Sequence, residues 1–180
     1  MGKVRLISGK FGGRWIATPD TSATHPMSSR ARIALFNKIS VEGKTVLDAF
    51  AGSGALGLEC LSRGARQVVF VEKNPLAART IRQNLARLDA TEDATVCQMP
   101  IERFVKSQTA DSPLFDVILA DPPYDNFEFS TVLSLKTYLR PNGLMVVSYP
   151  GRLREPTVNG VVVVDNRRYG EAALAVLRPE

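Results

Sequence analysis

The chain has 180 residues, of which 44% are hydrophobic and 23% charged, the composition of an ordinary globular domain. No apolar run approaches the roughly 18 to 20 residues that a membrane-spanning helix needs, and the first residues do not form a charged-then-apolar secretion signal. We therefore expect a cytoplasmic protein without a membrane anchor, organised as one domain with a small extension.

The cysteines and the histidine predict neither disulfides nor a metal site. Cys60 and Cys97 are far apart and lack CxxC spacing, and His25 is the single histidine. One histidine and two separated thiols do not make a zinc ligand set. Both cysteines are expected to be small buried side chains.

The net charge of +5 is unevenly distributed. Residues 1–38 carry a charge of +6, and the remaining 142 residues carry −1. The basic side chains of the first segment are Lys3, Arg5, Lys10, Arg14, Arg30, Arg32 and Lys38. A basic extension over residues 1–40 is thus joined to a nearly neutral body. Such a segment is typical of phosphate or nucleic-acid binding, although a merely solvated basic surface is the alternative.

Residues 4–7 and 14–18 predict two short strands, joined by a turn rich in glycine. Residues 19–26 are polar and contain two prolines, which predicts a loop. A helix is expected to begin at Ser28 or Ser29 and to end at Gly43. Its expected apolar face consists of Ile33, Leu35, Phe36 and Ile39. Its expected solvent face carries Arg30, Arg32 and Lys38.

From residue 41 onward, short apolar runs alternate with amphipathic stretches. The runs at 45–50, 67–71, 94–97, 115–120 and 143–148 predict strands, and the stretches at 55–62, 75–88, 101–107 and 128–138 predict helices. This alternation is typical of a parallel sheet with helices on both faces. Residues 161–165 and 172–177, joined by a turn at 166–170, predict an antiparallel hairpin at the edge of the sheet. The fold class is therefore α/β and Rossmann-like, with seven strands.

A glycine-rich loop follows the first of these strands. Gly52, Gly54 and Gly57 satisfy the pattern G-x-G-x-x-G, and Glu72 stands 20 residues after Gly52, where an acid can bind ribose hydroxyls. The pattern permits NAD or S-adenosylmethionine (SAM), and a purely structural turn remains possible. Asp48 favours SAM, because a carboxylate beside the loop repels a pyrophosphate but suits the methionine ammonium group.

Asp121, Pro122, Pro123 and Tyr124 follow the strand at 115–120. Two prolines stiffen the backbone and leave its carbonyl oxygens free. The carboxylate of Asp121 and a free carbonyl can accept hydrogen bonds from an exocyclic amine, and the ring of Tyr124 can stack on the base that carries it. The tetrapeptide predicts a nucleobase pocket; a turn that ends a strand is the plain alternative.

Several stretches resemble the RsmD family. They are Ile-Ser-Gly-Lys-Phe-Gly-Gly-Arg at 7–14, the segment 25–37, Asp-Ala-Phe-Ala-Gly-Ser-Gly-Ala-Leu-Gly-Leu-Glu at 48–59, Asp-Pro-Pro-Tyr at 121–124 and Tyr-Gly at 169–170. The likeness spans essentially the whole chain. It implies a SAM-dependent methyltransferase of a guanine N2 in small-subunit ribosomal RNA, with S-adenosylhomocysteine (SAH) as the product. His25, Ser29, Ile33, Pro100 and Ser148 depart from the family's usual residues.

The resemblance divides the chain into an RNA-binding extension, 1–40, and a methyltransferase domain, 41–180. We expect a monomer that acts on ribosomal RNA or on the assembling small subunit. The expected catalytic residues are Asp121, Pro122, Pro123 and Tyr124. Expected cofactor contacts are Asp48, Phe50, Ala51, Gly52, Ser53, Gly54, Gly57, Glu72, Lys73, Ile101 and Asp121. Expected RNA contacts are Lys10, Arg14, Arg30 and Arg32.

Three other functions remain open at this point. Methylation of adenine N6 in DNA would use the same tetrapeptide, but the chain has no separate base-reading domain. Methylation of glutamine N5 in proteins would typically need Asn in place of Asp121 and no basic extension. An RNA-binding module without enzymatic activity would not bind SAM.

Overall fold

The computed structural model describes residues 2–19, 27–109, 112–125, 127–157 and 159–180. The predicted loop at 20–26, with His25, falls outside these residues. Within them no helix is both long and apolar enough to cross a membrane.

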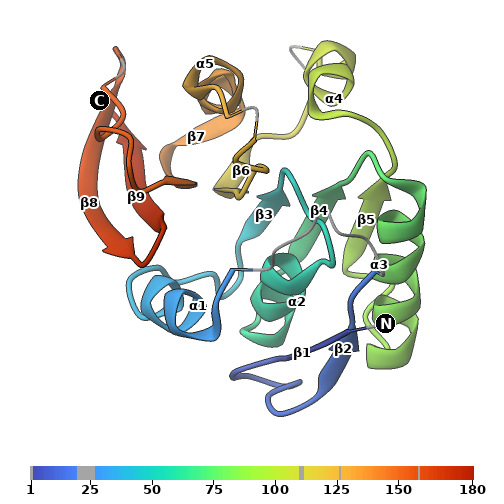
Figure 1. The fold of residues 1–180 in the computed structure, drawn as a ribbon. Coiled ribbons are helices and arrows are strands. Elements are labelled where there is room, and N and C mark those ends of the chain that lie inside the picture. The colour runs from blue at the N-terminus through green and yellow to red at the C-terminus, as the bar shows by residue number, and fades with distance from the viewer. Residues whose placement is uncertain (1, 20–26, 110–111, 126, 158) are drawn as a thin grey trace.

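A seven-stranded sheet forms the centre of the molecule (Figure 1). Its strands are β3 (Thr45–Asp48), β4 (Gln67–Val71), β5 (Ala94–Cys97), β6 (Phe115–Ala120), β7 (Leu139–Pro150), β8 (Val161–Tyr169) and β9 (Ala172–Pro179). Their order is β5-β4-β3-β6-β7-β9-β8; β3 to β7 are parallel, and β9 runs antiparallel to both β7 and β8. The predicted α/β fold and its C-terminal hairpin are confirmed. The strand order reverses at β3, and ligands of open α/β sheets bind at such a point.

Helices cover both faces of the sheet. They are α2 (Ala55–Ser62), α3 (Pro75–Leu88), α4 (Ile101–Ser107) and α5 (Phe129–Leu133), which continues into the 3-10 helix η1 (Ser134–Tyr138). The apolar residues of α2 and α3 belong to one hydrophobic cluster, and those of α4, α5 and η1 belong to a second. Each cluster fills one side of the sheet, as expected for a parallel sheet buried on both faces.

The extension consists of β1 (Lys3–Arg5), β2 (Trp15–Ala17) and α1 (Ser29–Phe36). The strands form an antiparallel pair, and Leu6, Phe11 and Ile16 belong to the same hydrophobic cluster as α2 and α3. The hairpin is also held by side chains of these two helices. Glu59 accepts hydrogen bonds from the backbone N–H groups of Ile7 and Ser8 at 2.7 and 3.1 Å. The extension is therefore a firmly packed part of the molecule.

Two further bonds complete this attachment. The hydroxyl of Ser62 accepts a bond from the N–H of Phe11 at 2.9 Å, and Asn84 pairs with both backbone groups of Ala17 at 2.9 Å. Ser62 is the last residue of α2, so the hairpin lies at the C-terminal end of this helix. In Figure 1 the arrows of β3, β4 and β5 point upward, whereas the hairpin lies below the sheet.

The predicted faces of α1 are wrong at two positions. Arg32 is only 2% exposed and Ile33 is 44% exposed, the reverse of the expectation. The guanidinium group of Arg32 donates to the carbonyl oxygen of Arg5 at 3.3 Å, so β1 buries it. Ser28 caps the helix as predicted, but the helix ends at Phe36 rather than at Gly43. The turn predicted at 166–170 is also too long, because β8 continues to Tyr169.

Candidate active site at the carboxyl edge of the sheet

Polar side chains gather where the parallel strands end. Asp48 is the last residue of β3, Glu72 follows β4, Asp121 follows β6, and Ser148 lies near the end of β7. Parallel strands present their carboxyl ends at one edge, which places these residues together. Asp48 is close enough to Asp121 and Glu72 for both carboxylates to raise its pKa.

The glycine loop brings backbone N–H groups to two of these carboxylates. Gly57 donates to Oδ2 of Asp48 at 2.9 Å, and Gly52 donates to Oε2 of Glu72 at 2.7 Å. A Cβ atom at Gly57 would lie 2.2 Å from the ring of Phe70 and 3.0 Å from the Asp48 carboxylate. Only glycine fits at this position, because any side chain would separate α2 from β3 and β4.

The electrostatics of the site favour a cationic ligand. The pKa of Asp48 is raised to about 7: burial is the largest cause, the Gly57 hydrogen bond partly offsets it, and the nearby carboxylates of Asp121 and Glu72 add to the rise. Desolvation likewise raises the pKa of Asp121 to about 6. Within the described residues neither carboxylate has an ion-pair partner. The ammonium and sulfonium groups of SAM would supply positive charge here, whereas a pyrophosphate would add more negative charge.

The Asp-Pro-Pro-Tyr tetrapeptide follows β6 and lies beside this loop, with Asp121 close to Asp48. Pro122 is buried and Pro123 is exposed, and Asp121 and Tyr124 are half-buried. The hydroxyl of Tyr124 lies 2.6 Å from that of Ser148, which is buried. A side-chain hydrogen bond from Ser148 also lowers the pKa of Asp121 against the effect of desolvation. Ser148 therefore connects the carboxylate to the ring. The sequence marked Ser148 only as a departure from the family, since a contact 24 residues away leaves no local signal.

The other predicted cofactor residues surround the same edge. Ala51 and Ser53 are buried in the loop, and Lys73 is exposed directly after Glu72. Ile101 is buried at the start of α4, in the hydrophobic cluster against which Phe50 also packs. The structure thus groups the predicted cofactor residues near one another, and their contacts with SAM remain a prediction.

The predicted RNA-binding residues lie elsewhere. Lys10 and Arg14 flank the ring of Phe11 on the exposed hairpin, and Arg30 is exposed on α1. Arg32 is buried, and burial lowers its pKa, so the expectation that it faces a phosphate at the surface is contradicted. The hairpin meets α2 at its C-terminal end, whereas the glycine loop precedes the N-terminal end of α2.

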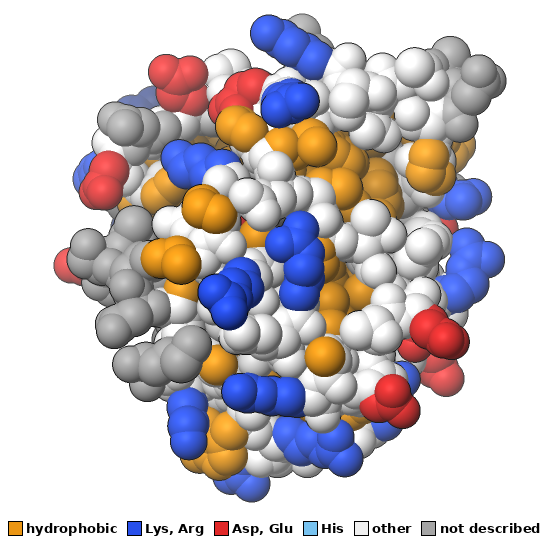
Figure 2. Space-filling view, turned by 90° about the vertical axis from the view of Figure 1, so that its right-hand side faces the viewer, with side chains coloured by type: hydrophobic (Ala, Val, Ile, Leu, Met, Phe, Trp, Pro, Cys, Tyr) orange, Lys and Arg blue, Asp and Glu red, His pale blue; other side chains and the backbone are white. Residues whose placement is uncertain are grey.

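Helix α3 adds exposed cations that the sequence reasoning missed. Arg79, Arg82 and Arg87 are exposed, and the helix contains no acidic residue. They lie opposite the buried face formed by Ile81, Leu88 and their neighbours. Figure 2 shows Lys and Arg side chains spread over the middle and lower part of this side of the molecule. The helical period of the sequence carried this signal, because Ile81, Leu85 and Leu88 recur every three to four residues and leave the arginines on the other face.

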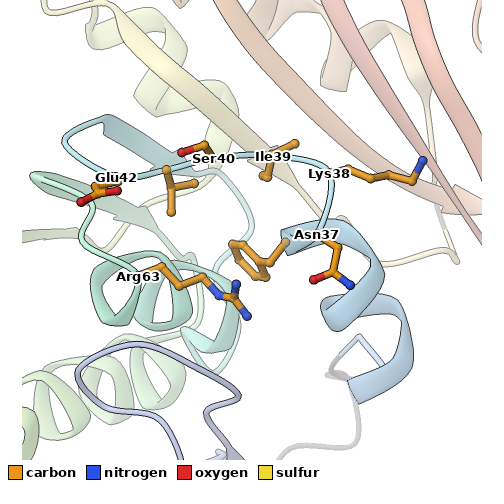
Figure 3. A pocket seen from close by; sticks show the side chains of 8 residues that line it. Asn37, Lys38, Ile39, Ser40, Glu42 and Arg63 are labelled. Atoms are coloured by element: carbon orange, nitrogen blue, oxygen red, sulfur yellow. The ribbon is translucent and has the colours of Figure 1, made fainter.

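A cavity of about 430 Å³ lies away from the carboxylates, between the ends of α1 and α2 (Figure 3). Asn37, Lys38, Ser40 and Glu42 line it together with Arg63. The guanidinium group of Arg63 stacks on the ring of Phe36 and binds Glu59 at 2.7 Å. These contacts join the extension to the body, and we assign this cavity a structural role.

The strand order, the switch point at β3 and the glycine loop define the fold of a class I methyltransferase, and the similar solved structures have this fold. A family described as "Conserved hypothetical protein 95" matches residues 4–178, and the chain belongs to this family, which confirms the resemblance to RsmD.

Relatives support this assignment over most of the chain. Ribosomal RNA small subunit methyltransferase D of Haemophilus influenzae is 35% identical over 81% of this chain and 78% of its own length. YlbH of Bacillus subtilis is 31% identical over 97% of this chain and 98% of its own length. The structure of yhhF from Escherichia coli matches with a TM-score of 0.89 at 29% identity, covering 99% of both chains.

Proposed function

We propose that this protein transfers a methyl group from SAM to the exocyclic N2 amine of a guanine in small-subunit ribosomal RNA. The observation that carries the proposal is the position of Asp121 to Tyr124 beside Asp48 and Glu72, the two carboxylates that the glycine loop contacts. The relatives named Ribosomal RNA small subunit methyltransferase D support ribosomal RNA as the substrate class.

The residues of the edge fit a bound SAM. Asp48 would hold the ammonium group, Glu72 the ribose hydroxyls, and Ile101 and Phe50 would lie near the adenine. When bound, SAM supplies an electrophilic methyl group for direct in-line transfer. The glycine loop lets the backbone approach the ligand closely.

The tetrapeptide would prepare the amine. The N2 lone pair of guanine is delocalised into the purine ring, which makes the amine a weak nucleophile. Hydrogen bonds accepted by Asp121 and by the Pro122 carbonyl would draw the amine towards pyramidal geometry and free this lone pair. Tyr124, held by Ser148, would stack on the base and fix its plane.

The target guanine must leave its stack to enter this pocket, which costs a few kcal/mol. Phosphate contacts by Lys10, Arg14 and Arg30 would offset part of this cost. Because the extension lies at the far end of α2, these contacts would be made with RNA distant from the target base. An extended or folded RNA is therefore a better substrate than a short oligonucleotide.

The test is the product of the reaction. Small subunits and naked ribosomal RNA from a strain that lacks the protein would be incubated with the purified enzyme and isotopically labelled SAM, then digested and analysed by mass spectrometry. We expect N2-methylguanosine at one position. Methyladenosine, or label in ribosomal protein alone, would contradict the proposal.

A further inference from the structure

A second cavity, of about 390 Å³, is lined in part by Phe127, whose ring contacts that of Tyr124 in the tetrapeptide. One wall comes from Phe127, Phe129 and Leu133, which follow the tetrapeptide in the chain. The lining also includes Leu153, Arg154 and Pro156, in the segment after β7. The mechanism proposed above uses none of these residues.

The aromatic wall is continuous with the catalytic motif. The ring of Phe127 stands edge-on to that of Tyr124, with the centroids 6.5 Å apart, and edge-on to that of Phe129 at 4.7 Å. The ring of Phe129 in turn packs against that of Tyr149, with the two ring centroids 5.4 Å apart. A base stacked on Tyr124 would therefore bring its neighbour in the strand close to Phe127.

The support behind this wall is rigid. The buried Tyr149 donates its hydroxyl to Asn166 at 2.9 Å, and the amide of Asn166 donates to Glu155 at 2.7 Å. These bonds tie β7, β8 and the segment after β7 together. Because these hydrogen bonds hold the lining segments together, binding would have to order few further side chains.

The lining fits a nucleobase with its phosphate. Aromatic and aliphatic side chains offer flat apolar contacts, on which any base can stack. Arg154 is an exposed residue of the lining and can meet a phosphate group. Glu155 is the acid of the lining, and its carboxylate is engaged by Asn166. A strand of RNA matches both the apolar lining and the exposed Arg154.

We propose that this cavity binds the nucleobase adjacent to the target guanine, which stacks against Phe127 while Arg154 contacts its phosphate. Extrusion of the target leaves its neighbour without a stacking partner, and the cavity replaces the lost contact. The inference rests on the proposed function in one respect, since it takes RNA as the substrate.

The test combines altered RNA with altered protein. RNA substrates would carry an abasic site on the 5′ or the 3′ side of the target, and the enzymes would be the wild type, Phe127→Leu and Arg154→Gln. Leu114→Ala is the control, because Leu114 is an exposed apolar side chain directly before the start of β6, whereas the tetrapeptide follows the other end of this strand. KM for RNA and kcat would be measured for each combination of enzyme and RNA, and the Kd of SAH would be measured for each enzyme.

For the wild type, we expect one of the two abasic sites to raise KM about tenfold. Phe127→Leu should raise KM for intact RNA by a similar factor, with the Kd of SAH unchanged, and the abasic site should add little further increase. Arg154→Gln should raise KM less and reduce its salt dependence. Leu114→Ala should keep the full abasic effect.

The proposal is overturned if neither abasic site raises KM for the wild type, or if the abasic effect is equally large in Phe127→Leu. The first result needs only the wild-type enzyme, so it remains decisive if Phe127→Leu does not fold. RNA binding measured by fluorescence anisotropy tests the cavity separately from methyl transfer. If neither abasic site affects the wild-type enzyme while N2 methylation is normal, the cavity has no such role and the proposed function stays intact.

Discussion

Asp48 and Glu59 are both buried carboxylates, but they stand at opposite ends of α2 and differ in their partners. Glu59 accepts bonds from Ile7 and Ser8 and pairs with Arg63, so its oxygens are fully used by the protein itself. Asp48 accepts a single bond, from Gly57, and burial raises its pKa to about 7. A carboxylate whose oxygens all accept hydrogen bonds from the protein stabilises the fold. A carboxylate that still has acceptor capacity is suited to hold a cationic ligand.

The largest expected effect is at the catalytic edge. Asp121→Ala should lower kcat by roughly two to three orders of magnitude, because it removes an acceptor aimed at the reacting amine. The melting temperature should not fall, since a carboxyl whose pKa is raised to about 6 on folding destabilises the native state above that pH. Single-turnover kinetics would measure the rate, and thermal denaturation would measure the melting temperature. Calorimetry with SAH would show that the variant still binds the cofactor product. Near-normal turnover would remove Asp121 from the mechanism.

The second effect is at the other end of α2. Glu59→Ala should lower the free energy of unfolding by about 3 kcal/mol or more, because it leaves Arg63 and two backbone N–H groups without their partner. Chemical denaturation measures this change. Glu92→Ala, which removes an exposed acid outside this junction, is the control. Unchanged stability would show that the hairpin is not anchored by Glu59.

The third effect is the pH dependence of cofactor binding. With a pKa of about 7, Asp48 is mostly ionised at pH 7.5 and mostly protonated at pH 6, so it pairs with the ammonium group only at the higher pH. The affinity for SAH should therefore fall roughly tenfold between pH 7.5 and pH 6. Calorimetry at both values would show this. Asp48→Asn should bind SAH weakly and without this pH dependence. If the pH dependence is unchanged in Asp48→Asn, it belongs to another titrating group.

The smallest effect separates two neighbouring arginines. Arg30→Gln should weaken RNA binding a few-fold and reduce the slope of log affinity against log salt by about one. Arg32→Gln should mainly lower the melting temperature, because Arg32 is buried and binds the Arg5 carbonyl. Binding would be titrated across salt concentrations. A smaller slope for Arg32→Gln alone would show that Arg32 becomes accessible to RNA.

The sequence predicted several features that depend on local periodicity. The strands of the parallel sheet, the helix α3 with its buried Ile81 and Leu85, and the glycine loop follow from spacing alone. The capping serine of α1 was also predictable, because Ser28 bonds to the N–H of Ala31 only three residues away. The C-terminal hairpin followed from the lack of room for a helix between its two strands.

Only the tertiary structure decided the contacts between distant segments. Arg32 lies 27 residues from Arg5, Glu59 lies 52 residues from Ile7, and Tyr124 lies 24 residues from Ser148. A residue type does not reveal which strand or hairpin will pack against it, so α1 was predicted with Arg32 and Ile33 on the wrong faces. Sequence thus determined the methyltransferase fold and the acids beside its loop. Packing decided which charged side chains hold the segments of the fold together. Whether a charge is buried, and whether its hydrogen bonds are all made within the protein, depends on neighbours that come together only when the chain folds.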